Sequence, residues 1–277
     1  MSVWFVTGAS RGFGREIVIA ALEAGHQVVA TVRDPGTDRL PQGYGERLLT
    51  TRLDVTHNRQ VEAAVAEAVT AFGRIDVLVN NAGYGLLGAV EETSDAEVRR
   101  LFDTNVFGLL SVTRAVLPIM RGQGAGHVIN LSSVAAISTV AGLSAYAATK
   151  HAVEGICEAL AEEVRPYGVK VTSVQPGSFR TDFLNATSFR HAERPLSAYD
   201  GTVRALAAHL EDRRGNQPGD PVAAAEAIIS IADADQAPAK LPLGSDCVAV
   251  LDGVLRARAE ELAVWRELAT STDYGAA

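Results

Sequence analysis

The chain has 277 residues, of which 47% are hydrophobic and 21% are charged. This length is enough to bury a sizeable core without disulfide bonds, and the composition excludes disordered and fibrous proteins. The formal net charge of -8 opposes binding to nucleic acid and to anionic lipid, so we expect no nucleic-acid partner and no membrane partner.

The first half of the chain alternates short runs rich in valine and isoleucine with alanine-rich stretches of helical period. This pattern predicts βαβ units and a parallel sheet. We expect one helix from Gly12 to about Gly25 and another that begins near Asn58. The strands expected between and around them cover residues 3–7, 27–32, 47–54 and 75–80.

The second half continues with longer helices. The pattern predicts helices over about 96–121 and 144–167, each followed by a strand, at 126–132 and 169–175, and a seventh strand at 240–243. We expect one α/β domain over residues 1–277, with a doubly wound parallel sheet and helices on both faces.

Two further segments stand apart from this alternation. Residues 183–220, which we call the lid segment, are polar and punctuated by proline and glycine, and we expect them to cover a substrate. Residues 245–277 are expected to form a helical C-terminal extension. Its apolar side chains fall on one side of that helix: Val250, Val254, Leu255, Ala259, Leu262 and Trp265.

A glycine-rich turn lies between the first strand and the first helix. Gly8, Gly12 and Gly14 let the backbone approach a phosphate closely, and backbone amides at the start of a helix attract its negative charge. The spacing is a variant of the dinucleotide-binding fingerprint. An ordinary tight turn between strand and helix is the alternative interpretation.

The end of the second expected strand bears on the choice of cofactor. Arg33 stands where an acidic residue would hydrogen-bond the ribose of NAD, and Arg11 in the glycine turn offers a second guanidinium. A guanidinium suits the 2′-phosphate of NADP. We therefore expect NADP(H), with NAD(H) possible because Asp34 could reach the ribose instead.

A candidate proton carrier follows in the second half. Tyr146 and Lys150 are four residues apart and share one face of the expected helix. A nearby ammonium favours the phenolate, so Lys150 is expected to lower the tyrosine pKa from its ordinary value of about 10. Ser133 follows the fifth strand at the edge where such sheets bind ligands. In isolation a Tyr-x3-Lys pair is more often an ordinary helix face.

Together these residues resemble the short-chain dehydrogenase/reductase (SDR) family over about residues 3–185, which implies a Rossmann-type fold. The resemblance implies that Asn105 joins Ser133, Tyr146 and Lys150 in a catalytic tetrad. It also implies these cofactor contacts: Gly8, Ser10, Arg11, Gly12, Phe13 and Gly14 with the pyrophosphate; Asp54 and Val55 with adenine; Asn81, Ala82 and Gly83 beside the ribose; Lys150 with the nicotinamide ribose; and Pro176, Gly177 and Thr181 with the nicotinamide end.

The chain departs from compact members of that family. It lacks the glycine-rich ending on which many of them build a tetramer, so a homo-oligomer is possible but its form is open. The extended tail and the loop after Thr181 resemble the branch of 17β-hydroxysteroid dehydrogenase-like reductases. That resemblance is not taken to imply a steroid substrate.

The predicted function is an oxidoreductase that interconverts a carbonyl and an alcohol on a small, fairly apolar molecule. Apolar residues expected to border its pocket are Leu86, Leu87, Phe179, Phe183, Leu184 and Phe189. The alternatives are a non-catalytic nucleotide-sensing protein and an enzyme that runs epimerisation or dehydration with the same groups.

Location and metal content are predicted from missing signals. Two cysteines cannot build a disulfide framework, and the apolar run beginning at Val3 leaves no room for a targeting segment, so we expect a cytoplasmic protein. Six histidines are scattered without ligand spacing, and no metal site is expected.

Overall fold

Seven parallel strands form the central sheet within residues 1–36 and 40–275, the part of the chain that the computed structural model describes. Their order is β3-β2-β1-β4-β6-β7-β9, which confirms the predicted strands and the doubly wound topology. The order reverses between β1 and β4, where such sheets open a ligand crevice at the carboxyl ends of the strands. The strands are β1 (Val3–Val6), β2 (Gln27–Val32), β3 (Leu48–Arg52), β4 (Val77–Asn80), β6 (Gly126–Leu131), β7 (Val169–Pro176) and β9 (Lys240–Leu243).

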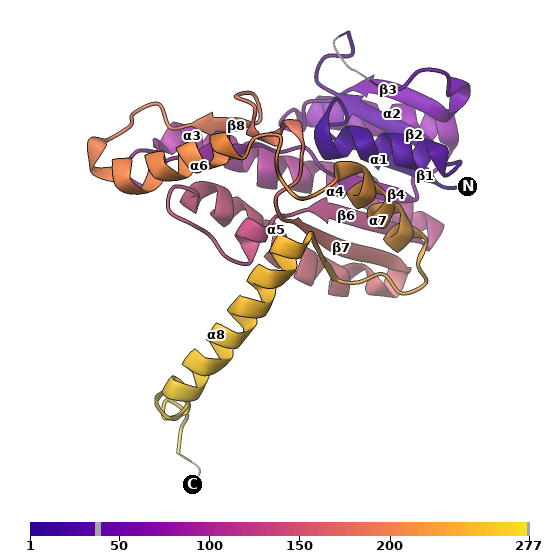
Figure 1. Cartoon of the computed structure of the whole chain (residues 1–277). Coiled ribbons are helices and arrows are strands. Elements are labelled where there is room, and N and C mark those ends of the chain that lie inside the picture. The colour runs from indigo at the N-terminus through magenta and orange to yellow at the C-terminus, as the bar shows by residue number, and fades with distance from the viewer. Residues whose placement is uncertain (37–39, 276–277) are drawn as a thin grey trace.

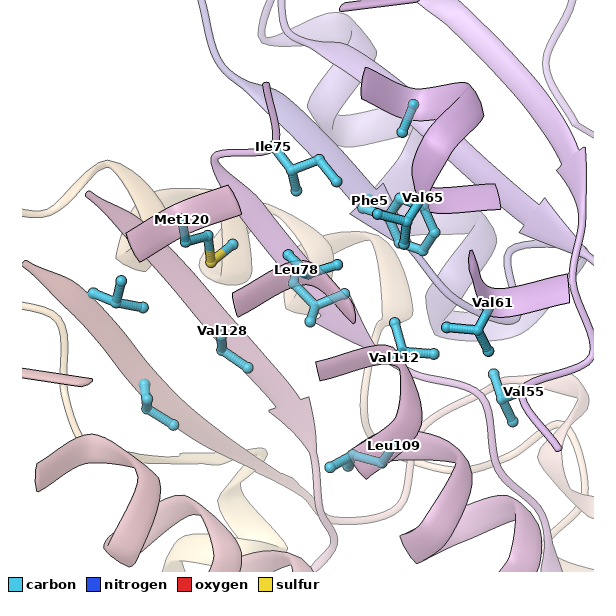
Figure 2. Packing of buried hydrophobic residues seen from close by; sticks show 14 of the residues in the cluster. Phe5, Val55, Val61, Val65, Ile75, Leu78, Leu109, Val112, Met120 and Val128 are labelled. Carbon is cyan, nitrogen blue, oxygen red and sulfur yellow. The ribbon is translucent and has the colours of Figure 1, made fainter. Parts of the chain in front are cut away.

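Helices cover both faces of the sheet (Figure 1). On one face α2 (Asn58–Phe72), α4 (Leu109–Gln123) and α5 (Ser144–Val164) bury an apolar cluster with the strands, part of which Figure 2 shows around Phe5 and Leu78. On the other face α1 (Gly12–Glu23) and α7 (Pro221–Asp233) pack against the sheet and against each other. The five inner strands are buried on both sides, as expected for a parallel sheet, whereas the edge strands β3 and β9 are partly exposed.

The helix predicted over 96–121 is interrupted. It begins as α3 (Asp95–Phe102), which Ser94 and Glu97 start with a capping box, and it continues into α4 through a π-helical segment, η2 (Asp103–Gly108). Gly108 packs so closely on Val55 that a Cβ there would lie 2.5 Å from Cγ2 of that valine. The predicted helical stretch is therefore present from Asp95 to Gln123, but it contains a π-helical segment that the periodicity did not predict, in which Asn105 is buried. Such π-bulges are frequent at functional sites.

The lid segment is more regular than expected. It contains the strand β8 (Phe189–His191), which pairs in parallel with β5 (Gly85–Leu87), and the helix α6 (Ala205–Asp212). Phe189 and Val203 of this segment pack with Leu87 of β5 in a small buried apolar cluster. Figure 1 shows α6 and β8 at one end of the sheet, on the same side as α3.

The predicted C-terminal helix is present as α8 (Ser245–Thr270) and extends away from the body of the molecule (Figure 1). Cys247 is its one buried residue. On its predicted apolar side Val250 and Val254 are partly buried near the domain, whereas the residues from Leu255 onward are exposed. Among the described residues, no helix combines the length and the apolarity needed to cross a membrane.

Candidate active site

Ser133 and Tyr146 meet at the carboxyl end of the sheet. Ser133 follows β6 and starts a short helical turn by accepting a hydrogen bond of 3.1 Å from the Ala135 amide. Tyr146 lies in the first turn of α5, and the Ser133 side chain is near enough to its phenol to lower the pKa of that phenol. The structure thus brings together two of the predicted catalytic residues.

The environment of Tyr146 is apolar. Its side chain packs with Leu86, and the ring of Phe183 covers it at a centroid distance of 5.8 Å. Burial raises the pKa of Tyr146 to about 12, and the nearby Ser133 side chain offsets only part of this effect. In the chain alone, then, the expected lowering of the tyrosine pKa by Lys150 does not occur. The phenol is neutral at physiological pH and carries a proton that it can donate.

Lys150 lies one turn further along α5. Its Nζ donates a hydrogen bond of 2.7 Å to the carbonyl oxygen of Leu131 and lies 5.8 Å from the Tyr146 ring centroid. Burial lowers the pKa of Lys150 to about 8, although the negative charge of Glu154 acts in the opposite direction. The ammonium is therefore still mostly protonated at pH 7, directly behind the phenol.

Asn105 connects the chain after β4 with helix α5. Its side-chain amide donates to the Tyr84 carbonyl at 2.9 Å and to Thr149 Oγ1 at 3.2 Å, and its Oδ1 accepts from the Tyr84 amide at 3.0 Å. Gly83 lies beside it, because a Cβ at Gly83 would stand 3.1 Å from Asn105 Oδ1 and 3.9 Å from Lys150 Nζ. The side chain of Asn105 therefore holds the chain after β4 against α5, next to the lysine.

The glycine turn has the backbone conformation that its sequence predicts. Gly8 and Gly12 have φ values of +66° and +54°, in the left-handed region that favours glycine. A Cβ at Gly14 would lie 2.4 Å from the Gly8 carbonyl oxygen. Arg11 at the N-cap of α1 makes no side-chain capping bond, and the first turn carries no acidic residue. The amides at this helix end thus fit a negatively charged pyrophosphate.

Asn81 holds that turn in place. Its Nδ2 donates to the carbonyl oxygens of Thr7 at 2.9 Å and Gly8 at 3.0 Å, while its own amide and that of Ala82 donate to Thr7 Oγ1. These bonds tie the end of β1 to the end of β4 across the switch point. Asn81 and Ala82 therefore shape the crevice that the cofactor prediction requires.

The residues predicted for the adenine end gather beyond β2 and β3. Burial tends to raise the pKa of Asp54, but hydrogen bonds from Thr56 and the charges of His57 and Arg33 outweigh it, so the pKa is lowered. Val55 is buried in the core, and Arg33 is exposed at the carboxyl end of β2. Asp34 accepts a hydrogen bond of 3.3 Å from the Gly36 amide. The carboxylate of Asp54 and the guanidinium of Arg33 thus share one edge of the crevice.

The residues predicted for the nicotinamide end close over the glycine turn. Pro176 ends β7, and the Gly177 amide donates to the Leu243 carbonyl at 2.9 Å. A Cβ at Gly12 would stand 3.6 Å from Thr181 Cβ, so Thr181 lies directly above the turn. Beside it Phe13 packs edge-on against Phe179, with ring centroids 5.1 Å apart.

Sequence reasoning missed the residues that fasten the lid segment. The carboxylate of Glu92 is completely buried and accepts hydrogen bonds from the amides of Ala89 and Leu196, each at 2.8 Å, and from Arg204 at 2.6 Å. Glu97 accepts from the Glu193 amide at 3.0 Å. The Ser-x-x-Glu spacing that ends at Glu97 was a readable capping signal. Nothing local marks Glu92 as a fastening residue, because its partners in the lid segment, Leu196 and Arg204, lie more than a hundred residues away.

The comparisons with known proteins place the chain in a family. Residues 2–191 match the family model of short chain dehydrogenases. Oxidoreductase BOA17 of Botryotinia fuckeliana (strain B05.10) is 37% identical over 98% of both chains. A short-chain dehydrogenase structure from Streptomyces avermitilis superposes with a TM-score of 0.91 and 42% identity, covering 99% of each chain.

Two further solved structures carry nicotinamide cofactors. A serine dehydrogenase complexed with NADP+ is 29% identical, with a TM-score of 0.74, and the match covers 87% of this chain and 94% of that one. A short chain dehydrogenase/reductase from Burkholderia phymatum in complex with NAD is 28% identical, with a TM-score of 0.80 and 94% of each chain covered. Structural neighbours thus bind either cofactor. The chain is therefore an oxidoreductase of the short-chain dehydrogenase family.

Proposed function

We propose that this protein is an NADP(H)-dependent oxidoreductase that interconverts a carbonyl and an alcohol on a small, fairly apolar molecule. One observation carries the proposal. A buried, neutral Tyr146 phenol lies beside the Ser133 side chain at the sheet edge, with the Lys150 ammonium one helical turn away. A proton donor, a second hydroxyl for the same oxygen and a fixed positive charge are what carbonyl reduction requires of a protein.

The roles follow from this arrangement. When bound, the reduced cofactor supplies the hydride that the carbonyl carbon receives. Tyr146 donates its proton to the carbonyl oxygen, and the Ser133 hydroxyl polarises that oxygen. Lys150 then stabilises the phenolate that remains. In the reverse direction the phenolate accepts the proton of the alcohol, and the lysine charge favours the form that this step needs.

The preference for NADP(H) rests on positive charge at the adenine end. Arg33 is exposed beyond β2 and Arg11 is half-buried in the glycine turn. A guanidinium there offers the 2′-phosphate a permanent charge. We expect Arg33→Asp to weaken NADPH binding at least tenfold and to leave NADH binding equal or tighter. The control Arg59→Asp, at an exposed position on α2, is expected to change neither affinity.

The apolar character of the substrate rests on the groups around Tyr146. Leu86 and Phe183 pack with Tyr146, whereas Leu87 and Phe189 belong to the cluster between β5 and the lid segment. Phe183 lies at the start of the lid segment, so a substrate that reaches the phenol must displace or contact this ring. We expect Phe183→Ala to raise KM for apolar ketones more than it lowers kcat.

The test is a fluorescence titration of the protein with NADPH and NADH, followed by a panel of aliphatic, aromatic and steroid ketones with the tighter cofactor. Tighter NADPH binding with net NADPH consumption is the expected result. Cofactor binding without turnover on any ketone would favour a nucleotide-sensing protein instead. Product formation without net change of cofactor would favour epimerisation or dehydration.

A further inference from the structure

The helix α8 exposes an apolar surface that the domain does not cover. It is 26 residues long, extends away from the body (Figure 1), and buries Cys247 alone. Leu255, Leu262 and Trp265 are 57%, 50% and 57% exposed. A helix without tertiary contacts is marginal in water, because most helical stability in proteins comes from packing an apolar face. A partner for this helix is therefore needed.

The apolar positions follow a heptad repeat. Six apolar residues and one arginine lie alternately three and four residues apart along α8, over three heptads. We call this row the α8 seam, and its members are Val248, Leu251, Leu255, Arg258, Leu262, Trp265 and Ala269. A strict three-four alternation is typical of a coiled-coil seam, whereas a helix packed on its own domain has a wider apolar face. The α8 seam thus fits another helix of similar length.

We propose that α8 pairs antiparallel with α8 of a second copy of this chain. Arg258 is the charged member of the α8 seam and decides the orientation. In a parallel pair Arg258 would face the partner's Arg258, and two like charges would meet in the seam. In an antiparallel pair Leu255 lies opposite the partner's Trp265, and Arg258 lies opposite the partner's Leu262 and beside the partner's Glu261.

Charges on the flank of the α8 seam that holds Asp252 and Arg266 are complementary in the same arrangement. In an antiparallel pair equivalent flanking positions meet, so Asp252 faces the partner's Arg266, twice by symmetry, while on the other flank Glu261 faces the partner's Glu261 with the two Arg258 side chains beside them. If the two helices were parallel, Glu261 of one helix would face Arg266 of the other, but the two Arg258 guanidinium groups would still meet in the α8 seam. The antiparallel arrangement also places the two domains at opposite ends of a helix about 39 Å long, at 1.5 Å per residue.

The first test is the mass of the full chain in solution by sedimentation equilibrium. We expect twice the chain mass of 29.2 kDa at micromolar concentration. Leu262→Glu places a charge in the α8 seam and is expected to give a monomer. Val264→Glu is the matched control, because Val264 is 74% exposed outside the seam, and this variant is expected to remain a dimer. A monomeric wild type, or a dimer that survives Leu262→Glu, would overturn the proposal.

The orientation is tested by distances between spin labels on single-cysteine additions. Both native cysteines are buried, so labels at Glu260→Cys and Thr270→Cys are selective. The antiparallel register is centred on Glu260, so labels there lie at the same height along the pair. Labels at Thr270 are separated by twenty residues along the axis, or about 30 Å. Short distances at both positions would indicate a parallel pair and contradict the proposal.

Discussion

Gly14→Ala tests whether the glycine turn is as closely packed as the structure indicates. The added Cβ would lie 2.4 Å from the Gly8 carbonyl oxygen and 2.5 Å from Asn81 Nδ2. Neither neighbour can retreat easily, because Gly8 is held in a left-handed conformation and Asn81 Nδ2 is bonded to the carbonyls of Thr7 and Gly8. An ordinary contact is about 3.5 Å, so α1 must move outward by about 1 Å.

The cost of that movement follows from two opposing effects. Overpacking of a close contact costs about 1–3 kcal/mol, while alanine is favoured over glycine in a helix by up to about 1 kcal/mol. The net destabilisation is about 1–2 kcal/mol, which lowers the thermal midpoint of a chain this long by about 2–4 °C. Because the displaced amides are those proposed to hold the pyrophosphate, we expect NADPH affinity to fall at least tenfold, about 1.4 kcal/mol.

The assay combines thermal unfolding with NADPH titration, and Gly155→Ala is the matched control. Gly155 lies within α5, and a Cβ there would meet nothing within 4 Å. This control is expected to gain about 0.5–1 kcal/mol of stability with an unchanged Kd. If Gly14→Ala unfolded at the wild-type temperature and bound NADPH equally well, the close packing of the turn and its role would both be refuted.

Three further predictions follow from buried polar groups. Burial lowers the pKa of His127 to about 4 from its ordinary value of 6.5, so the folded state keeps the imidazole neutral. This difference in pKa contributes roughly 3 kcal/mol to the free energy of unfolding. The contribution is complete above pH 6.5 and is lost as the pH falls toward 4. Urea unfolding is measured between pH 6.5 and pH 4, and His127→Gln is expected to lose less stability over this range than the wild type. An equal loss in both proteins would show that the lowered pKa of His127 does not cause it. Glu92→Gln removes the charged partner of Arg204, so we expect trypsin to cleave the lid segment faster. An unchanged cleavage rate would show that the Glu92–Arg204 pair does not fasten the lid segment. Burial raises the pKa of both Cys157 and Cys247 to about 11, so neither is expected to react with a thiol reagent until urea is added, and rapid reaction of the native protein would disprove their burial.

The features that were predictable from the sequence are those encoded by short, local patterns. The strand runs, the left-handed glycines Gly8 and Gly12, and the four-residue spacing of Tyr146 and Lys150 each need only a few neighbouring residues to be read. The parallel sheet then places the end of β6 beside the start of α5. This is why Ser133 and Tyr146 could be assigned to one site without a structure.

The features that were missed depend on contacts between distant segments. The three-residue strands β5 and β8 have little propensity of their own and form because they pair across about a hundred residues. The π-helical segment η2 ends at Gly108, which packs closely on Val55, and no helical periodicity reveals this contact.

The pKa of Tyr146 shows the same limit. The spacing of Tyr146 and Lys150 predicted a nearby positive charge that lowers the pKa of the tyrosine. Burial raises this pKa instead, and the burial depends on the packing of Leu86 and Phe183, which the spacing does not reveal. Sequence spacing gave the identity of the groups, and tertiary packing determined their protonation.

The central claim is that Tyr146 donates the proton in an NADP(H)-dependent reduction. The most direct measurement compares wild type and Tyr146→Phe for NADPH binding and for NADPH oxidation with a ketone that the wild type reduces. We expect an unchanged Kd for NADPH and a fall in kcat of about 100-fold or more, as for loss of a general acid. A variant that binds NADPH and retains kcat within a few fold of wild type would contradict the claim.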